Sequence, residues 1–278
     1  QHNDQNGHVT AELYSEIVTP DTRVVTILHA SPVTGISVDL EAISKAVHSI
    51  SPEALIIVDG VQYAAHGGIT IDQYNIDGYA ISPYKMYSRH GYGLAWVSDR
   101  LTKMNHEQLF DGPSENWELG TRDTGSYATI SNVVQYLEWL GEKIENTESR
   151  SVKLYNAAKA IAAQETALTD LMINGEDNIK GLKDLSGVEI IGGLKNPNRS
   201  GLVSFRINGT SSHLLVDFLN DKGIRTHVRK ADHYSGNILD PLGWEDCVRV
   251  SVCHYNSSEE IKSLLLALNE FQLDSATN

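Results

Sequence analysis

An uninterrupted apolar run, residues 54–58 (ALIIV), is the feature that most limits the fold of this chain. Full apolarity at consecutive positions is typical of a parallel strand covered on both faces, since a half-exposed strand would alternate apolar and polar residues. The run ends at Asp59 and Gly60, a strand end followed by a turn. The sequence therefore predicts a buried parallel strand that delivers a carboxylate to the carboxyl edge of a sheet, where active sites of such folds gather.

The first half of the chain alternates strands with helices around this run. Residues 23–28, 79–81 and 94–97 have the composition of strands, and residues 39–50 read as a helix with a possible N-cap at Ser37 or Asp39. This rhythm predicts an α/β domain with a mainly parallel sheet and covering helices.

The second half of the chain changes character. A long helical pattern over 124–161 is interrupted at 145–149. We then expect strands at 204–207, 224–228 and 247–251, with helices at 211–221 and 258–271 beside them. The sequence thus predicts a larger domain over 1–148 and a smaller C-terminal α+β domain over 149–278.

Composition narrows the classes of function. The chain has 278 residues and a formal net charge of -14, which argues against nucleic acid or an anionic membrane surface as a partner. Its two cysteines, Cys247 and Cys253, form neither a disulfide framework nor a zinc-site pattern, so we expect no metal. No basic apolar leader opens the chain, and no apolar run nears the roughly 20 residues of a membrane span, so we expect a cytoplasmic protein.

A lysine beyond the next predicted strand completes a chemical pattern with Asp59. Gln62 follows three residues after Asp59, and Lys85 comes after the strand at 79–81. A lysine amine can form a Schiff base with pyridoxal 5'-phosphate (PLP), and an aspartate can keep the pyridine nitrogen of PLP protonated. The three residues therefore suggest a PLP site, although Lys85 could be a surface lysine, Asp59 a turn cap and Gln62 a solvated amide.

Five short motifs give the chain a resemblance to a known family. They are VDGVQ at 58–62, SPYK at 82–85, GYGL at 91–94, ELGT at 118–121 and VRVS at 248–251. In order and spacing they resemble the PLP-binding core of the class V aminotransferases, which are PLP enzymes of fold-type I, and of their cysteine desulfurase-like branch. The resemblance implies a fold-type I large domain with a smaller C-terminal domain, and it covers most of the chain from about residue 29.

The resemblance also assigns coenzyme contacts. Lys85 would form the Schiff base, Gln62 would donate to the phenolic oxygen of PLP, and Ser82 would bind its phosphate. Tyr84 stands where the family motif has histidine, so it would donate a hydroxyl to the phosphate without imidazolium charge. Thr121 resembles the residue that binds the phosphate of the neighbouring subunit, which implies a homodimer; an ordinary helix cap is the alternative.

Substrate contacts come from the C-terminal motifs. Arg249 stands at the position that binds the substrate carboxylate, and Arg229 matches a second arginine position. His233 could contact substrate or be a plain loop residue, and both arginines could be solvated strand residues. Tyr234 falls at or beside the loop cysteine of desulfurases, so the usual persulfide route is disfavoured. Pro32 replaces an asparagine of the family motif and offers no amide.

These features predict a PLP-dependent enzyme that acts on an amino acid as an aminotransferase or a carbon–sulfur β-lyase. The relatives carry a further N-terminal stretch with a phosphate loop and a ring that stacks on PLP, and neither is found before Asp59, so we expect a fragment or a degenerate descendant. The alternatives are a non-catalytic dimerisation or binding module that keeps the fold, and a desulfurase with an atypical nucleophile. A nucleotide-binding domain is weakly supported because no glycine-rich loop follows an early strand.

Overall fold

The structure, a computed structural model, describes residues 8–121 and 123–277. The chain divides into two compact units. Among the described residues, the N-terminal unit comprises those within Thr10–His29 and Asp39–Lys159, and the C-terminal unit comprises residues 8–9, Ala30–Val38 and 160–277. The predicted domain boundary at 148 stays a prediction.

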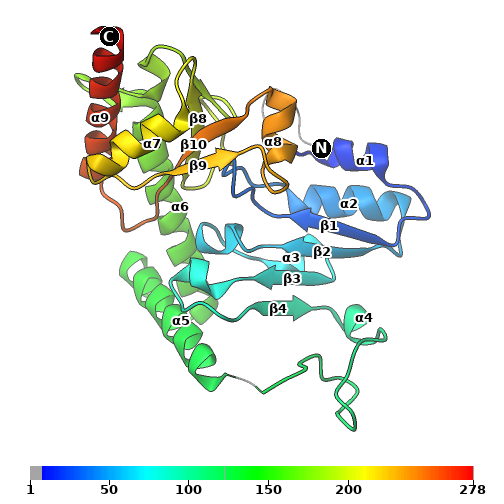
Figure 1. Cartoon of the computed structure of the whole chain (residues 1–278). Coiled ribbons are helices and arrows are strands. Elements are labelled where there is room, and N and C mark those ends of the chain that lie inside the picture. The colour runs from blue at the N-terminus through cyan, green and yellow to red at the C-terminus, as the bar shows by residue number, and fades with distance from the viewer. Residues whose placement is uncertain (1–7, 122, 278) are drawn as a thin grey trace. The chain divides into compact units, whose positions relative to one another are not determined.

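The N-terminal unit is built on one sheet with the strand order β1-β2-β3-β4 (Figure 1). Its first three strands are parallel, and β4 runs antiparallel to β3. The sheet is therefore mainly parallel, as predicted. The strands are β1 (Val24–Leu28), β2 (Leu55–Asp59), β3 (Gly78–Ile81) and β4 (Leu94–Val97).

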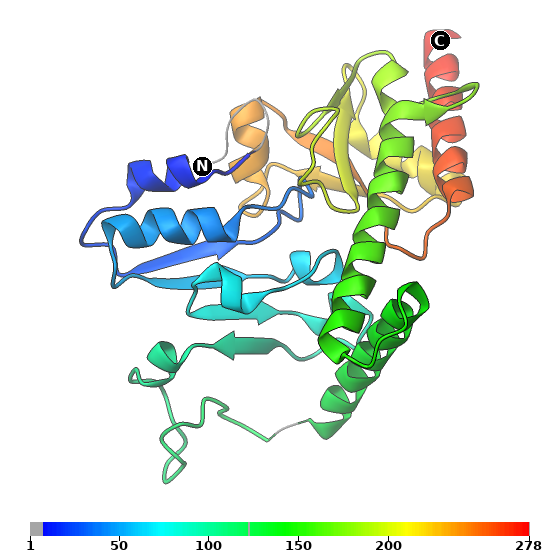
Figure 2. The same ribbon diagram turned by 180° about the vertical axis from the view of Figure 1, so that it is seen from behind.

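Helix α2 lies against this sheet with α1 beside it, as the view from behind shows best (Figure 2). The side chain of Asp39 caps α2 by accepting a hydrogen bond from the backbone nitrogen of Ala42 at 2.9 Å, which confirms the expected helix start. The described helical segments of this unit are α1 (Ala11–Ile17), α2 (Leu40–Ile50), α3 (Ile71–Tyr74), α4 (Asp99–Thr102), α5 (Thr124–Ile144), the first part of α6 (Arg150–Asn174), and the 3₁₀ turns η1 (Tyr63–Ala65) and η2 (Pro83–Met86).

Burial alternates along the central strand β2. Ile56 and Val58 are fully buried, whereas Leu55 and Ile57 are only half-buried. The apolar run is thus a strand, as predicted, but its second face is only partly covered. The expectation of burial on both faces rested on the run alone, which does not show what packs against it.

Strand β1 forms one edge of the sheet and shows the same asymmetry more strongly. Val25 and Ile27 are buried, while Val24 is 54% exposed and Leu28 is 41% exposed. Within the described residues β1 pairs with β2 alone. Strand β1 is therefore an apolar edge strand: among the described residues no strand pairs with its outer edge, and the side chains on one of its faces are exposed.

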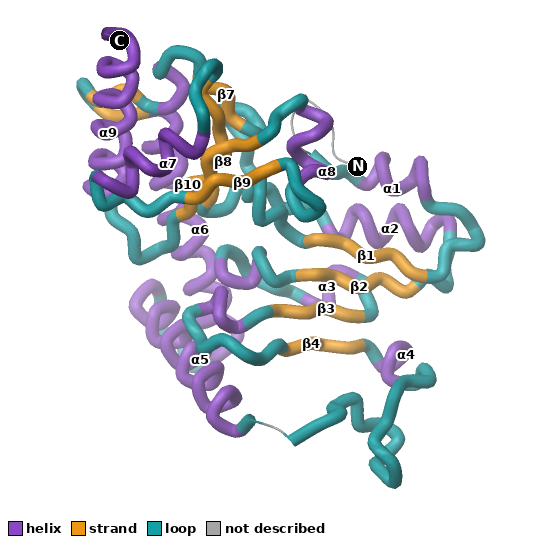
Figure 3. Tube along the Cα trace, viewed as in Figure 1, coloured by secondary structure: helices purple, strands orange, loops and turns teal. Residues whose placement is uncertain are grey.

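The C-terminal unit contains a four-stranded antiparallel sheet with the order β7-β8-β10-β9 (Figure 3). Its strands are β7 (Val188–Ile190), β8 (Leu202–Ile207), β9 (His227–Lys230) and β10 (Asp246–Ser251), beside a small hairpin of β5 (Gly175–Glu176) and β6 (Ile179–Lys180). Its helical segments are the end of α6, α7 (Ser212–Asp221), α8 (Gly236–Leu239), α9 (Ser258–Thr277), and the 3₁₀ turns η3 (Leu182–Asp184) and η4 (Asp240–Leu242).

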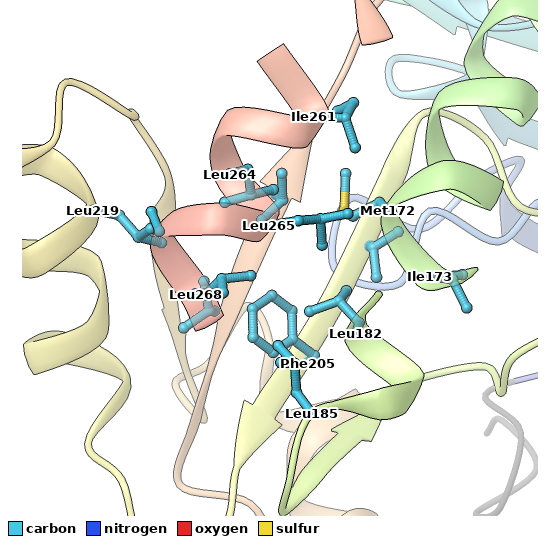
Figure 4. Packing of buried hydrophobic residues seen from close by; sticks show 14 of the residues in the cluster. Met172, Ile173, Leu182, Leu185, Phe205, Leu219, Ile261, Leu264, Leu265 and Leu268 are labelled. Atoms are coloured by element: carbon cyan, nitrogen blue, oxygen red, sulfur yellow. The ribbon is translucent and has the colours of Figure 1, made fainter. Parts of the chain in front are cut away.

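One face of this second sheet packs into a hydrophobic core (Figure 4). Phe205 of β8 is fully buried among Leu182 and the leucines of α9. The apolar stripes of α7 and α9 meet the sheet here because their leucines recur at helical spacing. The core includes Leu168, Met172, Ile173, Leu185, Val203, Leu215, Leu219, Val248, Val250, Ile261, Leu264, Leu265 and Leu268.

One predicted strand is displaced. The sequence predicted a strand over 224–228, whereas β9 covers His227–Lys230. The residues before it complete the exit from α7: Gly223 adopts a left-handed conformation with φ of 77°, and the Ile224 nitrogen donates to the Leu219 carbonyl at 2.8 Å. The β-branched residues Ile224 and Thr226, which looked like the start of a strand, therefore follow a helix-ending turn and precede β9.

Among the helices that the structure describes, none is both long enough and apolar enough to cross a lipid bilayer.

Candidate functional site

The turn after β3 places Lys85 beside Gln62. Lys85 lies in η2, which begins after Ser82, and the Lys85 backbone nitrogen donates to the Ser82 carbonyl at 3.0 Å. The Lys85 ammonium nitrogen, Nζ, donates to the amide oxygen Oε1 of Gln62 at 2.9 Å. Two of the residues singled out in the sequence, 23 positions apart, therefore meet in the N-terminal unit.

Asp59 ends β2 at the carboxyl edge of the sheet, as expected. Its carboxylate is exposed and accepts a hydrogen bond from the Val61 nitrogen at 2.9 Å. Its carbonyl accepts from the His29 nitrogen at 2.9 Å, which ties the strand end to β1. A Cβ atom on Gly60 would lie 2.1 Å from the ring of Tyr79. Glycine is therefore required next to Asp59 because the tyrosine ring fills the space of a side chain.

His66 is a functional candidate that the sequence analysis missed. The Gln62 side-chain nitrogen Nε2 donates to Nε2 of His66 at 3.1 Å. This contact fixes which end of the Gln62 amide faces Lys85, because the nitrogen end is held by the imidazole. A histidine four residues after Gln62, across one helical turn, was the available signal.

Replacing His66 with alanine should let the Gln62 amide rotate and weaken its contact with Lys85. On the sequence-based expectation that PLP binds beside Lys85 and Gln62, the loss of a net hydrogen bond of about 1 kcal/mol corresponds to a roughly fivefold weaker affinity for PLP. Absorbance during a titration with coenzyme would measure the affinity. His213→Ala, at an exposed position of α7 in the other unit, is the control. Equal affinities of wild type and His66→Ala would contradict the positioning role.

His29 belongs to an aromatic cluster under the carboxyl edge of the sheet. Its ring stacks on Tyr63 with a centroid separation of 3.6 Å and an interplanar angle of 21°. Its Nδ1 shares a hydrogen bond of 2.7 Å with the hydroxyl of Tyr79. Burial lowers the pKa of His29 to about 3, so the ring is neutral near pH 7. His29 is thus a packed core residue.

Acidification should destabilise the protein through His29. The unfolded chain binds a proton at the ordinary histidine pKa of about 6.5, whereas the folded ring does so only near a pKa of about 3. Between these values the unfolded state carries more protons, so stability falls as pH falls, by at most about 1.4 kcal/mol per pH unit. Urea unfolding at neutral pH and at about pH 5 would measure the slope. His29→Gln should show a shallower slope, and an unchanged slope would refute this assignment.

Of the remaining predicted coenzyme residues, Ser82 and Tyr84 belong to the turn that contains Lys85, and Thr121 lies on a separate segment. Ser82 is half-buried at the N-cap of the Lys85 turn. Tyr84 is 40% exposed, and its ring stacks on that of His90 at 4.4 Å. Thr121 is exposed in the stretch between α4 and α5. The fold thus joins Ser82 and Tyr84 to Lys85 in one turn, and the phosphate roles of Ser82, Tyr84 and Thr121 stay predictions.

The two predicted arginines lie on one face of the C-terminal sheet. In the antiparallel register, Arg249 of β10 stands opposite His227 of β9, and Arg229 stands opposite Cys247. The Arg249 nitrogen Nη1 donates to the carbonyl of Pro32 at 3.0 Å. Burial and, next, the charge of Arg229 lower the pKa of Arg249 to about 10. Arg249 stays cationic at neutral pH, and two positive charges are held close together.

The loop after β9 contains the aromatic residue expected there. Tyr234 is 57% exposed, and its ring lies 5.9 Å from the Arg229 guanidinium carbon. His233, beside it, is exposed. Cys247 is fully buried with a pKa raised to about 11, mainly by burial, and Cys253 is half-buried with its pKa also raised by burial. Neither thiol has the exposure and low pKa of a reactive cysteine.

In the described part of the chain no group of three or more histidine, cysteine, aspartate or glutamate side chains is arranged to hold a metal ion.

Three similar proteins place this geometry in context. A probable cysteine desulfurase of Xylella fastidiosa (strain Temecula1) is 27% identical over 95% of this chain and 60% of its own length. The aminotransferase-like protein FGM3 of Gibberella zeae is 29% identical over 95% of this chain and 62% of its own length. The apo structure of a cysteine desulfurase from Thermococcus onnurineus NA1 is 21% identical, with a TM-score of 0.78 over 99% of this chain and 65% of that one.

These similarities confirm the expected fold class, a fold-type I architecture of which the chain represents a part. The chain spans about 60% of the length of the curated relatives it matches. Residues 2–264 match the aminotransferase class-V family, and the chain belongs to that family.

Proposed function

We propose that this chain is part of a PLP-dependent enzyme that acts on an amino acid, as an aminotransferase or a carbon–sulfur β-lyase. The observation that carries the proposal is the 2.9 Å contact between the Lys85 Nζ and the Gln62 Oε1, just beyond two strands of the same sheet. Membership of the aminotransferase class-V family supports it.

The side chains of this region fit PLP. Lys85 offers an amine for its aldehyde carbon, Asp59 a carboxylate for its ring nitrogen, and Gln62 an amide for its phenolic oxygen. The Ser82 hydroxyl, half-buried in the same turn as Lys85, suits a phosphate oxygen. When bound, PLP supplies an electron sink for the bonds of a substrate α-carbon.

Each residue has a separate task in this proposal. Lys85 would bind the coenzyme covalently, and its amine would carry the proton of the substrate α-carbon. The exposed Asp59 carboxylate would hold a proton on the ring nitrogen. Gln62, oriented by His66, would donate one hydrogen bond to the phenolic oxygen of the coenzyme. Arg249 binds a substrate carboxylate with its guanidinium fork.

The proposal also concerns the fate of sulfur. Several relatives are called cysteine desulfurases, and a persulfide route needs an accessible thiolate. Here Tyr234 occupies the loop, and Cys247 is fully buried with a raised pKa. We therefore propose that carbon–sulfur cleavage would need no protein thiol: L-cysteine and water would give pyruvate, ammonia and sulfide, and no sulfur would pass to the protein.

A homodimer is part of the proposal. The stretch from 103 to 121, which contains Thr121, exposes large apolar side chains, and Phe110 is 96% exposed. Leu109 and Leu119 are each 49% exposed in the same stretch. Such a group of apolar side chains is typical of an interaction surface. Sedimentation equilibrium would measure the mass, and a monomer at all concentrations would refute the dimer.

The first experiment is borohydride reduction of the coenzyme-loaded protein at its native length. The expected result is loss of the visible absorption band and a coenzyme-sized mass increase on the peptide that contains Lys85. Lys103→Ala, at an exposed position of the same unit, is the matched control and should label normally. Label on another lysine, or no adduct at all, would overturn the proposal.

The second experiment supplies L-cysteine and measures pyruvate, alanine and sulfide. Pyruvate formation that is unchanged in Cys247→Ser and Cys253→Ser supports cleavage without a protein thiol. Alanine formation that disappears in either variant would show a persulfide route instead.

A further inference from the structure

Positive charge is concentrated on β9 and its neighbour β10. The pKa of His227 is lowered by burial and, after burial, by the positive charges of Arg249, Arg229 and Arg225. The whole chain carries a net charge of -14, so this concentration is not an average property of the protein. Sites of this kind in an acidic protein attract anions.

The positive charges of Arg229 and Arg249 are not paired with carboxylates of the described residues. Within the described ranges, neither Arg229 nor Arg249 has a carboxylate oxygen within 4.0 Å. Arg206, on β8 of the same sheet, is paired with Glu189 at 2.9 Å. The pKa of Asp232 is lowered first by hydrogen bonds from the backbone nitrogens of Ser235 and Tyr234, each at 2.9 Å, and only after them by the charges of His233 and Arg229.

The two arginines also contain unpaired buried atoms. The Nε atoms of Arg229 and Arg249 are buried and have no hydrogen-bond partner among the described residues. A buried polar group without a hydrogen-bond partner is unfavourable relative to a satisfied one. An anion that lets the two guanidinium forks reorient and form charge-assisted hydrogen bonds would recover that free energy.

The register separates the two forks. Arg229 pairs with Cys247, and Arg249 lies two residues further along β10, so the arginines are diagonal neighbours on one face. Diagonal side chains start about 7–8 Å apart, and one carboxylate satisfies one bidentate fork. We propose that this arginine pair binds a molecule with two acidic groups. The substrates would then be amino acids with an acidic side chain, and this last step rests on the proposed function.

The first test needs neither coenzyme nor turnover. Calorimetry on the protein at its native length would compare succinate with butyrate, which has the same chain length and one carboxylate. Succinate is expected to bind at least tenfold more tightly, a difference of about 1.4 kcal/mol. Arg229→Gln and Arg229→Lys should remove the difference, the latter because it keeps the charge but loses the fork. Arg206→Gln, whose arginine has its own partner, should leave it unchanged.

Three outcomes would overturn the inference. They are equal affinities for succinate and butyrate, no binding of either, and an equal weakening of both in the Arg229 variants, which would mean that both forks hold one carboxylate. Circular dichroism and thermal unfolding of each variant would separate a folding defect from a binding defect.

The second test links the pair to substrate choice. In the coenzyme-loaded protein, L-aspartate should change the coenzyme spectrum at a concentration at least tenfold lower than L-2-aminobutyrate of the same chain length. Arg229→Lys should abolish this preference. If the protein fails to take up coenzyme, the proposed function fails while the succinate result stands. If coenzyme binds and aspartate shows no preference, the inference about substrates is wrong.

Discussion

Replacing Lys85 with alanine should lower turnover of the coenzyme-loaded enzyme by about 10⁴-fold, the upper end for loss of a positioned proton-transfer group. The variant loses the amine that, in the proposed function, binds the coenzyme and moves the substrate proton, and alanine offers no substitute. The fold should persist, because Lys85 lies in a short turn after β3 and its backbone contact with Ser82 does not need the side chain.

Single-turnover kinetics with a saturating amino acid would measure the effect. Lys103→Ala serves as the control, because Lys103 is an exposed lysine of the same unit. Added methylamine should partly restore the rate of Lys85→Ala if the missing amine is the cause. Turnover within tenfold of wild type would remove Lys85 from the mechanism.

Replacing Asp59 with asparagine should impair chemistry far more than folding. The amide does not hold a proton on the coenzyme nitrogen, and losing one preorganised electrostatic contact typically costs about 3–4 kcal/mol of barrier, or about 10²–10³ in rate. The asparagine oxygen can still accept from the Val61 nitrogen, and the side chain is exposed, so the free energy of unfolding should change by less than about 0.5 kcal/mol.

The rate constant for the chemical step and a urea unfolding curve would be measured on the same preparation. Asp72→Asn, at an exposed carboxylate of α3, should alter neither. If Asp59→Asn retained wild-type turnover, the electron sink would not depend on this carboxylate.

Local patterns were sufficient to predict most elements of both units. Continuous apolarity identified β2, an Asp cap identified the start of α2, and the break at 145–149 separated α5 from α6. The start of β9 was predicted too early. Residues 224–226 have strand composition, but they follow the left-handed Gly223 that ends α7, and the strand begins only at His227. Propensity alone could not reveal that later start.

Contacts between distant segments were less accessible to sequence reasoning. Lys85 and Gln62 could be paired because each follows a strand of one parallel sheet. The neighbourhood of Arg229 and Arg249 depends on strand order in an antiparallel sheet, which spacing along the chain does not determine. The role of His29 becomes visible only through its packing against Tyr63, which shows that the fold itself uses the ring.

The open edge of β1 has a consequence for handling the protein. Residues 24–28 (VVTIL) contain no charge, proline or bulge, and these are the devices by which natural edge strands prevent pairing with other chains. A preparation in which nothing covers this edge will recruit further copies by backbone hydrogen bonding and will grow into β-rich aggregates as concentration rises. Replacing the exposed Thr26 with lysine would place a positive charge on this edge and would oppose the pairing of further copies.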